Sequence, residues 1–390
     1  MAIGTRDTEK PLRILQLIPS LEAGGAERAC LDIAAALSAE GGRSWVFSEG
    51  GRMADELSAL GGVLVKRAAA TKNPARIIAH GVTIAALARS HAIDIIHARS
   101  RAPAWSGLIA AKLTGLPYVT TFHGFYGAQN SLKRLYNSVM IRGDRVIAGS
   151  QFMASHIHDT YHCPHDRIAL IPRGIDTDRF DPARIDAQAV HALRQKWGAS
   201  PAQKVILLPG RLTRWKGQGL LLDAVARLND PALFTVMVGD PQGREGYVSE
   251  LKTQIDRLGL ANAVHIAGHV DDMPTAYQAA DIIVSASTDA EAFGRVPVEA
   301  MAMGKPIVAA DHGGASETLR GAEGQAAFGT LFTPGDAAAL AAALQQIPAL
   351  PAPEMATAAR AYVIANYSTQ SMCRRTLALY RSLCAAGCAT

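Results

Sequence analysis

The sequence predicts an α/β protein made of two Rossmann-like domains. Apolar runs of strand length alternate with helical patterns in both halves of the chain. This order gives a mostly parallel sheet with helices on both faces. A length of 390 residues favours two domains over one. With 49% hydrophobic and 19% charged residues, the chain can bury large cores, which excludes a disordered protein.

Each half carries six predicted strands, separated by helical segments. The first half has them at 12–18, 43–49, 93–99, 117–124, 144–150 and 168–174. The second half has them at 204–210, 234–240, 263–268, 281–287, 306–311 and 329–334. The segment 173–183, "RGIDTDRFDPA", reads as the junction between the two domains. The stretch 370–384 reads as a last helix.

Charge is distributed unevenly along the chain. Residues 1–184 contain 22 Lys and Arg against 16 Asp and Glu, whereas the remainder contains 17 against 18. A basic first half suggests an anionic partner such as nucleic acid, a phosphosugar or an anionic lipid, although an ordinary solvated surface explains it equally well. Five cysteines without a C-x-x-C pair favour a reducing compartment. We find no signal peptide and no run of 18 apolar residues, so we expect a cytoplasmic protein.

The stretch 211–220, "RLTRWKGQGL", follows a strand that is apolar throughout. Loops at the carboxyl ends of such strands bind ligands in doubly wound sheets. Arg211 and Lys216 are two cations in one glycine-punctuated loop, and together they could neutralise a diphosphate without a metal ion. Exposure to solvent is the usual fate of such side chains, and we expect it for Arg214.

A second cluster, 291–306, surrounds a predicted helix from Val296 to Met303. Backbone amides of Phe293, Gly294, Arg295 and Val296 would lie at its N-terminus, where anions bind. Glu291 precedes the helix and Glu299 lies in its early turns, so two carboxylates could bind hydroxyls on two parts of one ligand. Glu299 could instead only complement the helix dipole.

Two further candidates lie in the first half of the chain. Gly24 and Gly25 separate the first strand from a helix, and they could let backbone amides approach a phosphate. A glycine pair in a tight turn is an equally ordinary feature. His123 ends a predicted strand in "TTFHGFYG" (120–127), where a histidine is either structural or catalytic.

Taken together, these motifs resemble glycosyltransferase family 4, a retaining group with the GT-B fold. The resemblance runs from about Leu12 to Tyr367, in the order and spacing of the family. It rests on the loop of Gly24, Gly25 and Glu27, "HG" at 123–124, "IPRGIDTDRF", "GRLTRWKG", "VGD", "EAFGRVPVEAMAMGKPIVA" and "GGASE". One departure is Arg173, where the family commonly has Asn; we expect it to affect the junction more than the site.

The resemblance implies an acceptor domain over 1–182, with 370–390 returning to it, and a sugar-nucleotide domain over 183–369, facing each other across a cleft. It places Glu299 on the ribose, Glu291 and the 293–296 backbone on the donor sugar and phosphates, and Arg211 and Lys216 on the diphosphate. His123 would face the donor sugar, and Gly24 and Gly25 would close over the phosphates.

The implied reaction is transfer of a hexosyl group from a UDP-, GDP- or ADP-linked sugar to a glycan or glycolipid acceptor, in cell-envelope polysaccharide or lipopolysaccharide synthesis. No nucleic-acid partner, cofactor or metal ion is implied. Two alternatives stay open: a sugar-nucleotide 2-epimerase of the same fold and a transferase to a small soluble acceptor. The presence of Glu291, Arg211 and Lys216 together argues against a non-catalytic sugar-nucleotide sensor. A dinucleotide-dependent oxidoreductase needs a G-x-G-x-x-G spacing that 22–28 lacks.

Two segments imitate metal motifs. "DTD" (176–178) and the histidine-rich stretch 156–166 carry metal-ligand residue types, but we expect neither to bind a functional metal.

The segments 66–76 and 131–145 are basic and could contact an anionic membrane surface. In the second, Leu132, Leu135, Val139 and Met140 alternate with cationic side chains. We favour a helix packed on the core over an interfacial helix.

Overall fold

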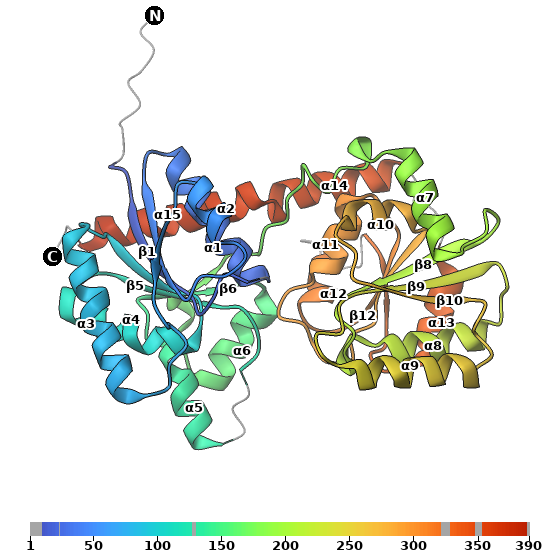
Figure 1. The fold of residues 1–390 in the computed structure, drawn as a ribbon, viewed down its shortest axis with the longest axis horizontal. Coiled ribbons are helices and arrows are strands. Elements are labelled where there is room, and N and C mark those ends of the chain that lie inside the picture. The colour runs from blue at the N-terminus through green and yellow to red at the C-terminus, as the bar shows by residue number, and fades with distance from the viewer. Residues whose placement is uncertain (1–9, 23, 127–129, 321–327, 348–352, 388–390) are drawn as a thin grey trace, which may run out of the picture. The chain divides into compact units, whose positions relative to one another are not determined.

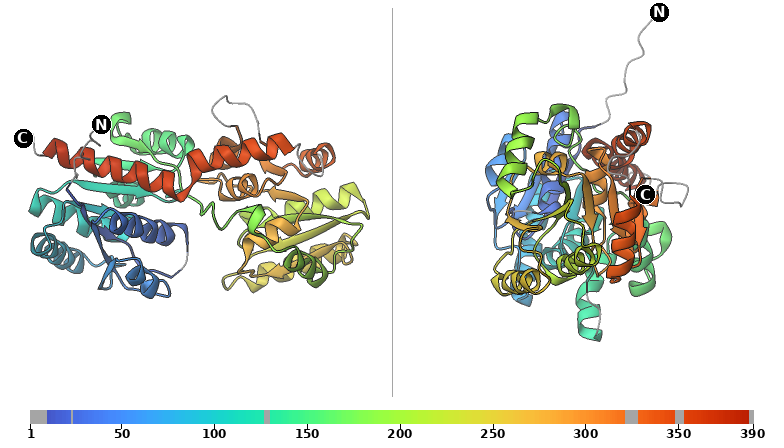
Figure 2. Two further views of the ribbon diagram at one scale, coloured as in Figure 1. Left: turned by 90° about the horizontal axis from the view of Figure 1, so that it is seen from above. Right: turned by 90° about the vertical axis from the view of Figure 1, so that its right-hand side faces the viewer.

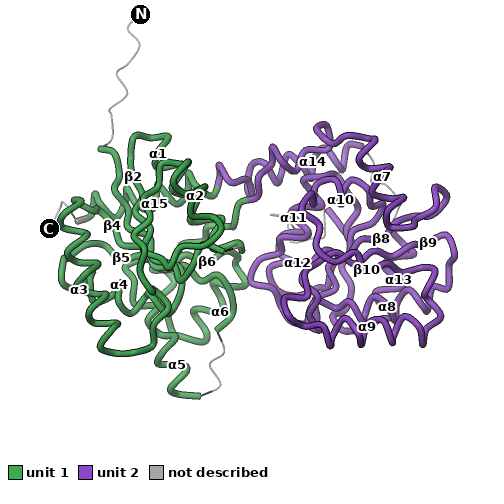
Figure 3. Tube along the Cα trace, viewed as in Figure 1, with its two compact units in different colours: residues 1–174, 372–390 green, residues 175–371 purple. Residues whose placement is uncertain are grey.

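The computed structural model describes residues 10–22, 24–126, 130–320, 328–347 and 353–387, which form two compact units. Unit 1 contains residues 1–174 and 372–390, and unit 2 contains 175–371 (Figure 3). The sequence placed the boundary at 182/183, whereas the units divide at 174/175. The intervening residues join unit 2 because Ile175 and Phe180 are buried in its core.

Unit 1 is built on a seven-stranded parallel sheet in the order β3-β2-β1-β4-β5-β6-β7 (Figure 1). Its strands are β1 (Arg13–Leu17), β2 (Arg43–Ser48), β3 (Val63–Lys66), β4 (Ile95–Ala98), β5 (Tyr118–Phe122), β6 (Arg145–Ala148) and β7 (Ile168–Leu170). Its helices are α1 (Gly25–Ala39), α2 (Ala54–Ala59), α3 (Pro74–Ser90), α4 (Arg101–Thr114), α5 (Ser131–Asn137) and α6 (Gln151–Tyr161). The sequence pattern missed β3, which is short and only partly buried.

Unit 2 repeats this design with six parallel strands in the order β10-β9-β8-β11-β12-β13. Its strands are β8 (Lys204–Pro209), β9 (Leu233–Val238), β10 (Val264–Gly268), β11 (Ile282–Ser285), β12 (Ile307–Ala310) and β13 (Thr330–Phe332). Its helices are α7 (Ala187–Trp197), α8 (Gln218–Leu228), α9 (Glu245–Arg257), α10 (Met273–Ala279), α11 (Arg295–Ala302), α12 (Gly313–Arg320), α13 (Ala337–Gln346) and α14 (Pro353–Tyr367). Helices cover both faces of each sheet (Figures 1 and 2). The predicted class, two Rossmann-like domains, is confirmed.

The strand order fixes where a ligand can bind in each unit. In unit 1 the chain winds in one direction from β1 and in the other from β4; in unit 2 the same reversal occurs between β8 and β11. Loops that leave the carboxyl ends of these two strands diverge to opposite faces of the sheet, so a crevice opens between them. Two switch points result, one in each unit.

The last helix, α15 (Thr369–Gly387), returns to the first domain as predicted. Met372, Cys373, Leu377 and Tyr380 are buried against side chains of α1 and the central strands of unit 1. The phenol oxygen of Tyr380 lies 2.6 Å from Nδ1 of the buried His97, so a polar contact adds to the apolar one. Burial of apolar area against the sheet holds the helix there.

The loop after β8 is tied to the end of β11 by close backbone contacts. The amide of Thr288 donates to the Trp215 carbonyl at 2.7 Å. Gly217 has φ 78°, and a Cβ built on it would lie 1.9 Å from the Ala286 carbonyl oxygen. Only glycine satisfies both the left-handed backbone and this approach.

We expect Gly217→Ala to destabilise the protein more than Gly243→Ala. Both glycines have φ 78°, so each alanine adds about 1–2 kcal/mol of backbone strain. A Cβ on Gly243 meets no heavy atom within 4 Å, whereas on Gly217 it meets the Ala286 carbonyl and adds about 1–3 kcal/mol. Urea unfolding measures both variants. Equal losses would contradict the close approach of the two loops.

Candidate functional site

The candidate site of unit 2 lies at its switch point, where loops from β8, β11 and β12 meet. The β8 loop carries Arg211 and Lys216, and the β11 loop carries Glu291. Lys216 and Glu291 are 75 residues apart in the sequence and are brought together by the pairing of β8 with β11.

Lys216 and Glu291 form an ion pair at the centre of this site. The Lys216 ammonium donates to Glu291 Oε1 at 2.8 Å, and each side chain is 12% exposed. The Ser287 hydroxyl donates to the same oxygen at 2.6 Å. The ammonium also lies 4.4 Å from the centre of the Trp215 ring, within cation–π range. The cation and the carboxylate are therefore fixed in orientation, and most of each is shielded from water.

The β12 loop supports the carboxylate side of the pair. His312 Nε2 lies 2.8 Å from the Ser287 carbonyl oxygen, and the Gly314 amide donates to the Glu291 carbonyl at 2.7 Å. Gly313 has φ 62°, and a Cβ there would lie 2.8 Å from the Glu291 backbone. The loop that holds Glu291 is thus packed against α12, which limits its movement.

The other two cations of the β8 loop differ from Lys216. Arg211 is exposed, with its guanidinium 6.0 Å from the centre of the Trp215 ring, and its carbonyl accepts from Gln218. Arg214 is exposed as expected, and it pairs with Glu250 at 2.6 Å. Of the three, Arg211 is the cation that remains available to an anion beside Lys216.

Helix α11 begins at Arg295, one residue before its predicted start. In its first turn Pro297 has no N–H, and the Arg295 amide donates to the Phe293 carbonyl at 3.2 Å, so of these first residues Val296 keeps a backbone N–H for an anion. A Cβ on Gly294 would lie 2.5 Å from the Ala315 backbone, so glycine lets α11 approach α12. Phe293 and Val296 are buried, which leaves their backbones and not their side chains for a ligand.

Glu299 is buried and held by two donors. The Tyr277 hydroxyl donates to its Oε2 at 2.8 Å, and Arg295 Nη2 donates to its Oε1 at 2.9 Å. Burial, and then the neighbouring Glu299 carboxylate, raise the pKa of Tyr277 well above its usual range, so this phenol stays a donor. The carboxylate keeps one fixed orientation, with lone pairs left for a further donor.

Gly24, Gly25 and His123 belong to unit 1. Gly24 has φ 149° and precedes α1, whose first residue is Gly25. His123 follows β5, and neither of its ring nitrogens has a hydrogen-bond partner among the residues that the structure describes. Burial, and then the nearby Arg173 and Arg99, hold the pKa of His123 well below its usual range, so the imidazole is neutral at pH 7.

Several residues of these sites were missed from the sequence. Ser287, Trp215, Tyr277 and His312 have no spacing that marks them, because their roles arise from contacts between distant segments. Arg173 was assigned to the junction; instead its guanidinium donates to the His123 carbonyl and lines the same cavity as His123. The long reach of an arginine side chain explains the error.

The two metal-like segments have structural contacts of other kinds. Asp176 Oδ1 accepts the amides of Asp178 and Arg179 in a turn. His158 stacks on His165 with ring centres 3.8 Å apart, and its Nδ1 lies 2.9 Å from the Cys163 carbonyl oxygen. Within the described ranges, no three His, Cys, Asp or Glu side chains gather as metal ligands do.

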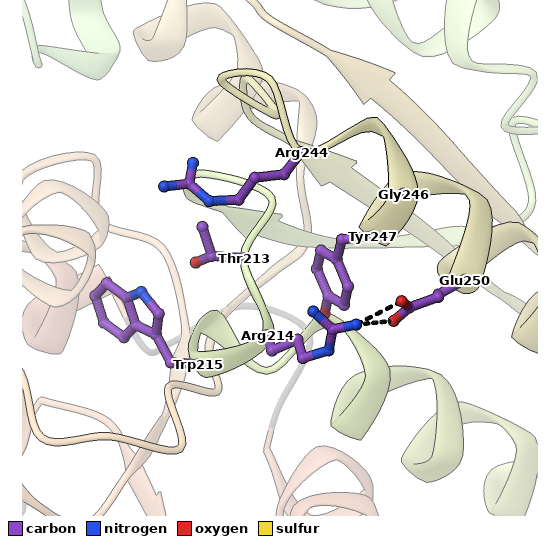
Figure 4. Close-up of a pocket in the computed structure, with 7 residues that line it drawn as sticks. All are labelled: Thr213, Arg214, Trp215, Arg244, Gly246, Tyr247 and Glu250. Carbon is purple, nitrogen blue, oxygen red and sulfur yellow. Dashed lines mark hydrogen bonds and ion pairs between the residues drawn. The ribbon is translucent and has the colours of Figure 1, made fainter.

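A hollow of about 510 Å³ opens between the β8 loop and the start of α9. Figure 4 shows its lining, with the Arg214 guanidinium directed at the Glu250 carboxylate. It is lined by Thr213, Arg214, Trp215, Arg244, Gly246, Tyr247 and Glu250. Because Lys216, Glu291 and Glu299 are not part of this lining, the hollow is a neighbour of the ion-pair site and not the same site.

Comparison with known proteins gives two family matches that together cover most of the chain. Residues 190–364 match the family model described as glycosyl transferases group 1, and residues 23–179 match glycosyltransferase family 4. A curated D-inositol 3-phosphate glycosyltransferase of Jonesia denitrificans is 28% identical over 333 residues, which are 75% of this chain and 76% of that protein. Another, from Catenulispora acidiphila, is 32% identical over 65% of this chain and 63% of its own length.

Solved structures agree with these matches. A glycosyltransferase from Rickettsia africae is 34% identical, with a TM-score of 0.88, over 96% of this chain and 99% of that one. The Anabaena protein HepE, in complex with UDP, is 28% identical, with a TM-score of 0.81, over 95% of this chain and 100% of that one. With the two switch-point sheets, these likenesses show that the chain belongs to glycosyltransferase family 4, has the GT-B fold and is a glycosyltransferase enzyme.

Proposed function

We propose that this enzyme transfers a hexosyl group from a nucleoside-diphosphate sugar to a glycan or glycolipid, with retention of configuration and without a metal ion. The observation that carries the proposal is the fixed Lys216–Glu291 pair at the switch point of unit 2, next to the N-terminus of α11. HepE has been solved with UDP and with UDP-glucose, which supports a UDP-linked donor over the GDP and ADP alternatives.

Lys216 and Arg211 are assigned to the diphosphate. Negative charge develops on the leaving phosphate, and a fixed cation stabilises it at little cost in reorganisation. Lys216 is already held in place by Glu291 and Trp215, so its side chain does not have to be ordered when the donor arrives. Arg211 adds a second, exposed cation, and the Val296 amide at the N-terminus of α11 adds a further donor. This supply of positive charge makes a metal ion unnecessary.

Glu291 and Glu299 are assigned to different parts of the donor. Glu291 Oε1 is occupied by Lys216 and Ser287, whereas its Oε2 has no partner among the described residues and can accept a sugar hydroxyl. Glu299, fixed by Tyr277 and Arg295, is assigned to the ribose hydroxyls. A carboxylate bound to a lysine and a serine is a poor nucleophile. This favours a front-face reaction, in which the leaving phosphate itself takes the acceptor's proton.

Neutral His123 is assigned to the donor sugar as a hydrogen-bonding group and not as a cation. Gly24 and Gly25, at the N-terminus of α1, are assigned to the phosphates. None of the relatives named above is an epimerase, and transfer to an acceptor is the activity that we propose.

The acceptor is assigned to a membrane-associated glycan because of α5. Leu132 and Leu135 are 77% and 56% exposed on this helix, beside Lys133 and Arg134. The expectation of a core-packed helix is wrong for these leucines. Val139 and Met140 are buried, but they lie in the following 3₁₀ turn, Ser138–Ile141. Exposed leucines between cations suit an anionic lipid surface. Among the described residues, no helix has the length and apolar character needed to cross a membrane.

We expect Lys216 and Glu291 to be strongly coupled in folding stability. In a double-mutant cycle with alanine at both positions, the coupling should be about 1–3 kcal/mol, because each single variant strands a mostly buried charge. The exposed Arg214–Glu250 pair is the matched control and should give about 0.2–1 kcal/mol. Urea unfolding of all variants measures this. A coupling no larger than the control's would show that the pair is not preorganised.

We expect Glu299→Ala to weaken UDP binding about tenfold or more in calorimetry, since it loses charge-assisted bonds to ribose. Glu291→Ala should bind UDP nearly as wild type does but should no longer transfer glucose from UDP-glucose. Release of UDP in the presence of EDTA measures the transfer. Equal affinity losses in both variants would refute the division of roles. Absence of UDP release with every donor and acceptor offered would refute the transferase proposal for these substrates.

We expect wild-type protein to sediment with anionic vesicles and less with neutral ones, and less again at 1 M salt, where the Debye length is about 3 Å. The double variant Leu132→Ser/Leu135→Ser should lose the vesicle binding that persists at high salt. The control Ile78→Ser/Val82→Ser changes two apolar residues of α3 that are 56% and 55% exposed, and it should keep this salt-resistant binding. Absence of vesicle binding, together with rapid transfer to a soluble sugar, would replace the membrane acceptor with a small soluble one.

A further inference from the structure

The switch point of unit 1 contains a buried cation that has no anionic partner within the described residues. Arg99 follows β4 directly and is 4% exposed. Its Nε donates to Gln16 Oε1 at 2.6 Å, but its Nη2 has no hydrogen-bond partner. Gln16 is neutral, so it satisfies a donor without compensating the charge. A buried guanidinium without a carboxylate is costly.

Gln16 cannot turn away from Arg99, because its amide nitrogen is already bonded. It donates to the Cys30 carbonyl at 3.0 Å and to the Ser44 hydroxyl at 2.8 Å. The amide oxygen therefore has to face the guanidinium. This network positions Arg99 from β1, α1 and β2 at once, in the manner of a binding residue held by its neighbours.

Arg99 lines a small cavity with two other groups that can donate. Its lining includes Arg99, His123 and Arg173. Both ring nitrogens of His123 are buried and unpartnered, so three donor or acceptor atoms of two residues lack partners in one place. The cavity volume is about 30 Å³, too small for a sugar and large enough for one or two oxygen atoms.

We propose that this cavity is an oxyanion subsite, which takes a phosphate or carboxylate group carried by the acceptor. This proposal rests on the proposed function and specifies the chemical class of the acceptor: a molecule with an anionic group close to the hydroxyl that receives the sugar. An oxyanion supplies the acceptor atom that Arg99 Nη2 lacks, and its charge offsets that of the buried guanidinium. The same chemistry could come from the donor diphosphate, and the experiment separates these sources.

The first experiment measures the affinity of the intact chain for inorganic phosphate by calorimetry. Wild type should bind phosphate, and Arg99→Gln should lose about 10- to 100-fold in affinity, the loss of one or two charge-assisted bonds. Arg99→Lys should recover part of it. Arg43→Gln removes the same charge at the amino-terminal end of β2, away from the carboxyl ends of the strands where Arg99 lies, and should bind as wild type does. Circular dichroism and thermal unfolding check that each variant is folded. If Arg99→Gln does not fold, the phosphate affinities of Arg99→Lys and Arg43→Lys are compared instead.

The second measurement assigns the source. Lys216→Ala should leave phosphate binding at this subsite intact, and Arg99→Gln should leave UDP affinity unchanged. Transfer to a phosphorylated polyol should show a KM raised at least tenfold in Arg99→Gln, with little change for the unphosphorylated polyol. Loss of UDP affinity in Arg99→Gln would assign the subsite to the donor and overturn the proposal. The proposal would also be overturned if Arg99→Gln bound phosphate as tightly as wild type does, or if wild type did not bind phosphate. Phosphate binding without any transfer would refute the proposed function alone.

Discussion

The salt bridge between Lys216 and Glu291 is the interaction on which the proposed donor site depends. Residues so distant in sequence meet because β8 and β11 are adjacent at the point where the sheet reverses its winding. The glycines at 217 and 313 allow the loops to approach, and Ser287 and Trp215 fix the two charged groups. The positive charge is in place before any ligand binds, as electrostatic catalysis requires.

The switch point of unit 1 also holds a cation, Arg99, but the charge of this cation is not compensated in the same way. Lys216 has a carboxylate partner in the resting protein, whereas among the described residues Arg99 is bonded to the neutral Gln16 and to no carboxylate. The free energy that this costs in folding is a reason to look for a function, because strained or uncompensated groups gather at functional sites. In this account, the first cation serves a phosphate that leaves and the second serves an anion that stays.

Much of this could be predicted from the sequence, for physical reasons that also set the limit. Strand–helix alternation gave the two sheets, and proline and glycine gave the bounds of α11 to within a residue, because these signals are local. Contacts across the switch point are not local. The pattern thus identified Lys216 and Glu291 but not their ion pair, and it misjudged Arg173, whose side chain reaches His123. Apolar spacing at 131–145 favoured a helix packed on the core, whereas Leu132 and Leu135 are exposed.

The most direct test is the turnover of Lys216→Ala with saturating UDP-glucose and acceptor in EDTA, beside Arg214→Ala from the same loop. If Lys216 stabilises the departing diphosphate without a metal ion, its loss lowers kcat about 10²–10³-fold, as removal of one fixed donor does. Arg214→Ala should turn over as wild type does, since that guanidinium is exposed and pairs with Glu250. Equal rates in both variants, or wild-type activity abolished by EDTA and restored by Mg²⁺, would contradict the account.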